Sequence, residues 1–317
     1  MKKTNCTFIH LIDHDRSIFK LIAPLQKFED HKIITSFSKN IIDIEGINSM
    51  LSRKGLVIII HMTGGHKPFY DLKEYLLQQY QNIFFFLHVS PTFFKLKGKE
   101  DELSILIKLA IQYEITILTP SRELEKEFSK LGVKSKFVQI GTDHLLATYP
   151  TRKSGHFITT VCSSGTIEYE TIKGIDIFSK LMRESSYEDK ALIFGQNMRD
   201  LGNIKTMFLS ENKFISMLKK SRIFMQLSRT EAYNVSAIYA KRLKIPVIVS
   251  DIEGHIDNVK YGFRVKDETD AKKYLDLIFE YPDSKMLNEI IDMNFADSIE
   301  RETLSNFHLS FNQILEK

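Results

Sequence analysis

The pattern most informative about the fold is Ser228-Arg-Thr-Glu231-Ala-Tyr233-Asn234-Val-Ser236-Ala-Ile-Tyr239-Ala240-Lys-Arg-Leu-Lys-Ile-Pro246-Val-Ile-Val-Ser250-Asp251. It follows the apolar run Ile223–Leu227, so the order of patterns is strand, turn, helix and strand. In a parallel sheet, the turn and the start of the helix lie at the carboxyl end of the strand. The unpaired N–H groups of that helix start, here near Val235, favour a phosphate. Glu231 on the turn is predicted either to contact hydroxyl groups of a ligand or only to cap the helix.

The same alternation of short apolar runs and amphipathic stretches fills both halves of the chain. The runs of the first half are Phe8–Ile12, Ile33–Phe37, Leu56–Ile60, Ile83–Leu87, Ile115–Leu118 and Phe137–Ile140. Those of the second half are Phe157–Val161, Ala191–Phe194, Thr206–Leu209, Ile223–Leu227, Val247–Val249 and Gly262–Val265. Because they are too short for helices and rich in Ile, Val or Phe, they predict strands of parallel sheets covered on both faces.

The amphipathic stretches between the runs predict helices. In the first half they are Ser17–Phe28, Phe69–Tyr80, Leu103–Tyr113 and Arg122–Leu131. In the second half they are Ile175–Arg183, Phe214–Lys219, Val235–Leu243, Ala271–Phe279 and a final helix over Asp297–Leu315. A chain of 317 residues is long enough for two domains. The polar segment His144–Gly155 predicts the linker, and we place the domains at residues 1–148 and 149–296, followed by residues 297–317.

Composition narrows the class of protein. Only two cysteines occur, Cys6 and Cys162, without zinc-ligand spacing, which argues against a zinc site and a disulfide framework and favours the cytoplasm. The net charge of +4 is mild and its excess lies in the first half. This fits either an anionic or membrane-proximal partner or an ordinary solvated surface. No motif supports nucleic-acid binding, and no run reaches the length of a membrane span. The short apolar run at the N-terminus predicts a strand and not a signal peptide.

A second informative segment is Val161-Cys-Ser163-Ser164-Gly165-Thr166-Ile-Glu-Tyr-Glu-Thr-Ile-Lys173-Gly174. A strand leads into a turn of small residues, whose N–H groups could approach a diphosphate. Lys173-Gly174 is predicted to open the next helix, and the lysine would supply compensating charge. A lysine at a helix start without any ligand is the alternative interpretation.

Together these segments resemble the donor site of glycosyltransferase family four. Glu231 matches the first glutamate of that family's signature, and Ala240, Pro246-Val-Ile and Ser250 to Val259 resemble the following positions, with Asp257 at an acidic place. Lys173-Gly174 matches its Lys-Gly element. The chain departs from the pattern at two points. Tyr239 replaces the second glutamate, which usually holds the ribose, and the usual arginine of the Ser163–Gly165 turn is absent. The first-domain end, Ser121 to Asp143, resembles the family's domain junction.

The resemblance implies a GT-B fold, in which two Rossmann-like domains face a cleft, and a retaining transfer of sugar from a nucleotide-diphosphate sugar. A UDP-sugar would be the donor, and the acceptor would be a glycan, a lipid-linked molecule or a protein in bacterial surface glycan synthesis. Residues 297–317 would cross back to the first domain. The implied catalytic residues are Glu231, Lys173 and His88. The implied donor-binding residues are Ser163, Ser164, Gly165, Tyr233, Asn234, Val235, Ser236 and Tyr239. Neither a metal nor another cofactor is expected.

Other segments also contain residue types that can carry chemistry. His61 also follows a predicted strand and has either a structural or a site role, and the glycine-rich loop Thr63–His66 beside it could face the acceptor. Asp13-His14-Asp15 has the form of a metal motif but lacks further ligands. Phe93–Lys99 mixes aromatic and basic residues and predicts a surface loop or a peripheral contact with an anionic lipid. The departures also leave two rival functions open: a non-catalytic partner subunit of a glycosylation complex, and an epimerase on the same fold.

Overall fold

The computed structural model describes residues 6–10, 25, 31–35, 56–60, 77–78, 82–142, 155–162 and 165–315. The chain divides into two compact units. Unit 1 comprises Met1–Asp143 together with Glu302–Lys317, and unit 2 comprises His144–Arg301. The division at residue 143 lies close to the predicted one at residue 148, and most of the predicted linker falls outside the described residues.

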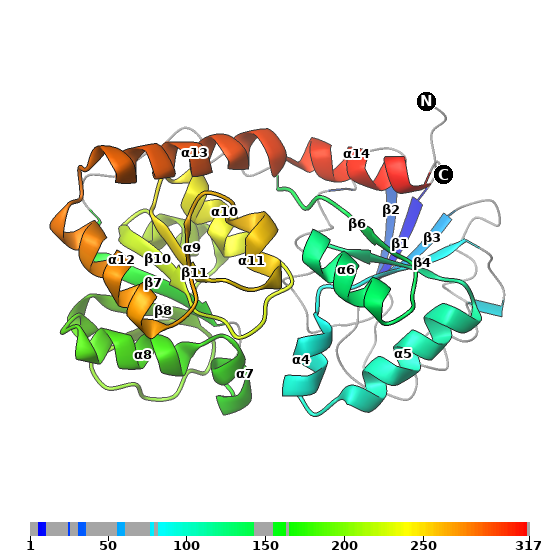
Figure 1. Ribbon diagram of the computed structural model, residues 1–317, viewed down its shortest axis with the longest axis horizontal. Coiled ribbons are helices and arrows are strands. Elements are labelled where there is room, and N and C mark those ends of the chain that lie inside the picture. Colours follow the sequence, from blue (N-terminus) through cyan, green and yellow to red (C-terminus); the bar gives the residue numbers. More distant parts are fainter. Residues whose placement is uncertain are drawn as a thin grey trace. The chain divides into compact units, whose positions relative to one another are not determined.

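Unit 1 is built on a six-stranded sheet with the strand order β2-β1-β3-β4-β5-β6, drawn in blue to green in Figure 1. All neighbouring strands are parallel. The strands are β1 (Cys6–His10), β2 (His31–Thr35), β3 (Leu56–Ile60), β4 (Ile83–Phe86), β5 (Thr116–Thr119) and β6 (Ser135–Phe137). The runs Ile83–Leu87 and Ile115–Leu118 bury Phe85, Leu87 and Ile117 in one apolar cluster. The continuous apolar runs therefore correspond to parallel strands, as predicted.

Three helices between β4 and β6 begin at sequence-encoded caps or acidic first turns. They are α4 (Pro91–Leu96), α5 (Glu100–Gln112) and α6 (Arg122–Lys130). Ser121 caps α6 by accepting a hydrogen bond from the N–H of Leu124 at 3.2 Å, as the start signal predicted. The prediction of a loop at Phe93–Lys99 is wrong over its first part, because Phe93 and Phe94 lie in α4. Phe94 is buried in the core of unit 1, so its ring is not available to a lipid surface.

The C-terminal segment forms two helices instead of the single predicted one. Helix α13 (Lys285–Arg301) ends in unit 2, and α14 (Leu304–Leu315) belongs to unit 1. Between them, the carbonyl of Glu302 accepts a hydrogen bond from the N–H of Thr142 at 2.9 Å, and Thr303 forms a bridge with Thr142. The Thr303 hydroxyl then accepts the N–H of Asn306 at 3.1 Å and starts α14. These contacts with residues far away in sequence interrupt the helix, and they are invisible to a local helical pattern.

Unit 2 contains a second parallel sheet with the order β12-β11-β10-β7-β8-β9. Its strands are β7 (Phe157–Cys162), β8 (Ala191–Gly195), β9 (Lys205–Met207), β10 (Ser221–Gln226), β11 (Val247–Ser250) and β12 (Phe263–Val265). The chain leaves β7 toward β8 and β9, then returns to β10 on the other side of β7. The carboxyl ends of β7 and β10 therefore form the switch point at which α/β sheets bind ligands. Each of the two units is therefore a Rossmann-like α/β unit with a parallel sheet.

The helices of unit 2 lie between its strands, except for the last two, which follow β12 (Figure 1). They are α7 (Ile167–Ile172), α8 (Ile175–Glu184), the 3-10 helix η4 (Glu188–Lys190), α9 (Glu211–Leu218), α10 (Val235–Arg242), α11 (Glu253–Asn258), α12 (Glu268–Glu280) and α13. Helix α7 was not predicted, and it changes the position of Lys173. That residue follows the end of α7, while Gly174, at φ +68°, precedes α8. A side chain at Gly174 would place its Cβ 1.8 Å from the carbonyl oxygen of Leu227, so only glycine fits this close approach to the β10 loop.

Candidate functional site

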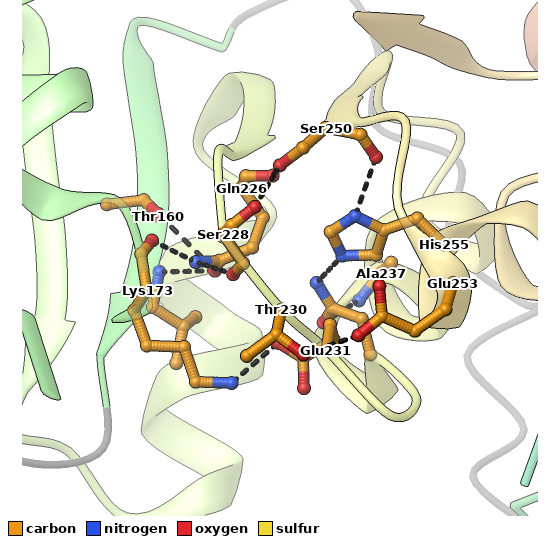
Figure 2. A network of polar contacts seen from close by, with 12 residues as sticks. Thr160, Lys173, Gln226, Ser228, Thr230, Glu231, Ala237, Ser250, Glu253 and His255 are labelled. Atoms are coloured by element: carbon orange, nitrogen blue, oxygen red, sulfur yellow. Dashed lines mark hydrogen bonds and ion pairs between the residues drawn. The ribbon is translucent and has the colours of Figure 1, made fainter. Parts of the chain in front are cut away.

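The switch point of unit 2 brings together the two residues that the motifs singled out. Lys173, at the α7–α8 junction, and Glu231, in the loop after β10, form an ion pair with 2.5 Å between Nζ and Oε2 (Figure 2). Only 18% of the lysine side chain and 12% of the glutamate side chain are exposed. A partly buried pair of opposite charges is therefore held at the end of the sheet where ligands of this fold bind.

The environment of Lys173 keeps its ammonium group charged. Burial lowers the pKa of Lys173, but the Glu231 carboxylate and the nearby Tyr169 act in the opposite direction and raise the pKa above its ordinary value overall. The ring of Tyr169 also lies 5.9 Å from the ammonium nitrogen. At neutral pH, the site therefore presents a cation whose present counterion is the carboxylate. An anionic ligand could compete with Glu231 for this cation, and the freed carboxylate could accept hydrogen bonds from hydroxyl groups.

The first turn of α10 lies on the same loop, and its cap is part of a buried network. The Asn234 amide oxygen accepts the N–H of Ala237 at 3.1 Å. His255 is fully buried, and burial lowers its pKa to about 3, so the ring is neutral. Its Nδ1 donates to the carbonyl of Ser250 at 3.0 Å, so its Nε2 accepts from the Asn234 amide nitrogen at 3.4 Å. Both ends of the Asn234 side chain are thus used in shaping the helix start.

Thr230 and Glu253 form a contact that the sequence motifs did not predict. The Thr230 hydroxyl donates to the carboxylate of Glu253 at the start of α11 (Figure 2). Gly254 packs so closely that a Cβ there would lie 2.0 Å from the Glu231 carbonyl oxygen. The resemblance pointed instead to Asp257, whose carbonyl oxygen accepts a hydrogen bond from Arg301 at 2.8 Å. The glycine at position 254 is the sequence signal that could have identified the close packing of α11 against the Glu231 backbone.

A second ion pair holds the loop after β10 against α8. The guanidinium of Arg229 donates to both carboxylate oxygens of Asp176, at 2.8 and 2.6 Å, and its backbone N–H donates to the carbonyl of Ile172 at 2.8 Å. In sequence, Asp176 and Arg229 lie between Lys173 and Glu231, so the two ion pairs join the same two segments of the chain. No sequence pattern links residues more than 50 positions apart, so this contact needed the folded chain.

The remaining predicted donor residues lie in different settings. Tyr233 is 7% exposed, while Val235 and Ser236 are half-buried at the start of α10. Tyr239 is 6% exposed and belongs to an apolar cluster, with its ring tilted against Phe214 at 6.2 Å. This packing explains a tyrosine here without a nucleotide. A contact of Tyr239 with the ribose stays a prediction.

Other predicted site residues are only partly testable. Ser163, Ser164, His61, Thr63–His66 and Asp13–Asp15 lie outside the described residues. Gly165 is described, and a Cβ there would lie 1.8 Å from the carbonyl oxygen of Asn197, which explains its small size. His88 follows β4 in unit 1, and its ring packs edge-on against Phe86 with 4.3 Å between centroids. It does not belong to the unit that carries Lys173 and Glu231, so its role in the site stays a prediction.

Among the residues that the structure describes, no group of three or more His, Cys, Asp or Glu side chains could hold a metal ion. In the same part of the chain, no helix is long and apolar enough to cross a bilayer.

Comparison with known protein sequences gives a partial match. No protein-family model matches the chain. A protein of Sulfolobus islandicus filamentous virus named "Putative glycosyltransferase 41" is 26% identical over 178 residues, which is 52% of this chain and 52% of the viral protein. The chain thus matches about half the length of that relative.

Solved structures match almost the whole chain. HepE of Anabaena, solved in complex with UDP and glucose, has a TM-score of 0.74 and 12% identity over 99% of this chain and 100% of its own. Sucrose-phosphate synthase of Thermosynechococcus elongatus has a TM-score of 0.74 and 13% identity over 99% and 98% of the two chains. The UDP-forming trehalose-phosphate synthase of Burkholderia vietnamiensis has a TM-score of 0.69 and 11% identity over 99% and 97%. At these identities the likeness shows the fold, which is the GT-B class with two Rossmann-like units.

Proposed function

We propose that this chain is a glycosyltransferase that transfers a sugar from a nucleotide-diphosphate sugar to an acceptor. The observation that carries the proposal is the Lys173–Glu231 ion pair at the switch point of unit 2, beside the start of α10. A cation, a helix N-terminus and a carboxylate are the groups needed to hold a diphosphate and an attached sugar. The glycosyltransferase name of the viral relative and the fold of the sugar-phosphate synthases support the same activity.

In the proposed reaction, the bond between the anomeric carbon and the diphosphate oxygen breaks, and its electron pair stays on that oxygen. A hydroxyl oxygen of the acceptor bonds to the anomeric carbon, and its proton is released. The largest electrostatic demand is the charge that develops on the departing diphosphate. The ammonium of Lys173 and the N–H groups at the start of α10 would stabilise that charge. Glu231, released from the lysine, would orient the hydroxyl groups of the sugar.

The donor is proposed to be a UDP-sugar, because HepE was solved with UDP and glucose and the trehalose-phosphate synthase is UDP-forming. Retention at the anomeric carbon, a role in surface glycan synthesis and a glycan, lipid-linked or protein acceptor follow from the family resemblance. His88 would line the junction of donor and acceptor. The chemistry can proceed without a metal if Lys173 and the helix start supply the positive charge.

One observation favours a second function, a non-catalytic partner subunit of a glycosylation complex. Tyr239 occupies the position of the expected ribose-binding glutamate and is packed in the apolar core. A site without that carboxylate would bind a nucleotide more weakly, and such a chain could retain the fold for contacts with a catalytic partner.

A panel of UDP-, GDP- and ADP-sugars tests the proposal. The purified chain should be warmed with each compound to record the melting temperature, and release of the nucleoside diphosphate should be followed in parallel. A ligand at 100 times its dissociation constant stabilises the folded state by about 2.7 kcal/mol. Stabilisation with turnover by at least one sugar nucleotide is expected. Absence of both with every donor would overturn the enzyme proposal and favour the partner subunit.

A further inference from the structure

A buried glutamine lies behind the ion pair and connects the elements that carry it. Gln226 is the last residue of β10 and is 2% exposed. Its amide nitrogen donates to the carbonyl of Lys173 at 2.9 Å and to the hydroxyl of Ser228 at 3.1 Å (Figure 2). Its amide oxygen accepts the N–H of Val161 at 3.3 Å and the hydroxyl of Thr160 at 3.4 Å. One side chain therefore contacts the end of β7, the α7–α8 junction and the loop after β10.

The position of Gln226 in the sheet explains why a side chain is needed there. Strands β7 and β10 are paired as far as Phe224 and Thr159, with a register shift between Ser221 and Ile223. Beyond that pair, the N–H of Val161 in β7 donates to the Gln226 side chain. The amide thus continues the hydrogen bonding of the sheet into the opening where the strands diverge. Because that opening is the switch point, the amide also sets the spacing of the loops around it.

The loop after β10 is fixed on the opposite side as well. The hydroxyl of Ser250 donates to the carbonyl of Ser228 at 2.6 Å, and the carbonyl of Ser250 accepts from His255. Ser228 is therefore held between the Gln226 amide and β11. The α7–α8 junction is held by the Gln226 amide at the carbonyl of Lys173 itself, and by Arg229 at the neighbouring Ile172 and Asp176. Gln226 is thus the side chain that contacts the backbone of the residue bearing the ammonium group.

Resting on the proposed function, we propose that Gln226 is a positioning residue of the reaction, which places the Lys173 ammonium against the Glu231 carboxylate and against the diphosphate of the donor. An amide is suited to this role, because it donates on one side and accepts on the other without carrying charge. A leucine of similar size would fill the space and hold neither side. A glutamate could hold the Lys173 carbonyl only when protonated, since a carboxylate has no proton to donate.

The test compares Gln226→Leu and Gln226→Glu with the parent in three measurements. These are the steady-state kinetics with the best donor of the panel, the melting temperature, and the rate at which acetic anhydride modifies the Lys173 amine, followed by mass spectrometry. In Gln226→Leu we expect kcat to fall by about 100-fold, the scale of a displacement of about 1 Å at a reacting centre, with a much smaller change in donor KM. Acetylation of Lys173 should become faster, because the ammonium would lose the carboxylate that keeps it protonated.

Gln226→Glu supplies a pH-dependent readout of the same contact. A buried carboxyl group has a raised pKa, so it is protonated and able to donate as the pH falls. The ratio of kcat between this variant and the parent should therefore rise toward acidic pH. No such rise is expected for Gln226→Leu, which serves as the reference at each pH.

Thr159→Val is the matched control, since Thr159 is also fully buried in unit 2 and its hydroxyl donates to the carbonyl of Ile223 at 3.2 Å. It should lower the melting temperature without changing kcat or Lys173 acetylation. If Gln226→Leu behaves like this control, Gln226 is only structural and the inference is overturned, while the enzyme proposal stands. If the parent turns over no nucleotide sugar, the enzyme proposal fails, and the rate of Lys173 acetylation alone decides whether Gln226 places the ion pair.

Discussion

The ammonium of Lys241, buried in α10, lies 3.6 Å from the carboxylate of Asp297 in α13. The same carboxylate accepts two hydrogen bonds from Arg301, at 2.7 and 2.8 Å, and Lys241 also donates to the carbonyl of Asn258. Burial raises the pKa of Asp297, but the hydrogen bond from Arg301 and the charge of Lys241 outweigh it, and the pKa is lowered overall. The helix whose start faces the candidate site is thus anchored to α13 by a buried carboxylate.

The contact between Lys241 and Asp297 predicts that substitutions of these two residues lower the free energy of unfolding by different amounts. Asp297→Asn should lower the free energy of unfolding by about 3 kcal/mol, because it leaves the buried Lys241 without its counterion. Lys241→Met should cost less, because Asp297 keeps Arg301 and methionine fills the space of the lysine stem. Urea unfolding of the parent and both variants measures this difference. An equal or larger loss in Lys241→Met would show that the lysine, and not the carboxylate, is the essential member.

His255 predicts a loss of stability in acid. Its folded-state pKa is about 3, against an ordinary value of 6.5, because it is buried. The unfolded chain therefore binds a proton between these values while the folded chain does not. The contribution of this histidine is fully present above pH 6.5 and is lost progressively as the pH falls toward 3. Urea unfolding across this range should show less pH dependence in His255→Gln than in the parent. A histidine signal in NMR that titrates near 6.5 in the folded parent would contradict this assignment.

Two glycines have similar backbone angles but different surroundings. Substituting each one therefore distinguishes the cost of backbone strain from the cost of disrupting close packing. Gly174 and Gly202 have φ values of +68° and +74°, but only at Gly174 would a Cβ meet another atom, the Leu227 carbonyl oxygen at 1.8 Å. Gly202→Ala should cost about 1–2 kcal/mol from the left-handed conformation alone. Gly174→Ala should cost more, and it should also reduce sugar transfer, because it displaces the junction that carries Lys173. Melting temperature and transfer are measured on the same samples, and equal effects of the two changes would refute the packing argument.

We predict that substituting either member of the Lys173–Glu231 pair lowers turnover more than it lowers stability. Lys173→Ala should lower kcat by roughly 10²–10³-fold, the scale for removing one donor that stabilises charge at a reaction centre. Glu231→Gln keeps the shape and part of the hydrogen bonding but removes the charge, so it should reduce turnover with a smaller change in melting temperature. Lys180→Ala is a control, because Lys180 pairs with Glu268 at an exposed position of α8. Parental rates in both site variants would show that the pair is not catalytic.

Local patterns in the sequence were sufficient to predict most elements of the sheets. The runs around Ile83–Phe86, Ala191–Gly195 and Val247–Ser250 could be predicted as strands because each is short and apolar. The start of α6 is also predictable from local sequence, because Ser121 is a residue type that caps helices. The missed helix α7 had a local signal too, since the Thr166 hydroxyl caps it by accepting the N–H of Tyr169.

Contacts between distant segments decided the rest. Lys173 and Glu231 were each recognisable from a motif, but their pairing depends on the order in which β7 and β10 lie in the sheet. The break between α13 and α14 arises where Thr142 bonds to Glu302, and no helix propensity records that bond. Tyr239 differs from the expected glutamate in a way that a motif can detect, yet only packing against Phe214 and its neighbours shows where the ring lies. Periodicity reports which face of an element is buried, whereas side chains from separate elements meet only once the sheet order is established.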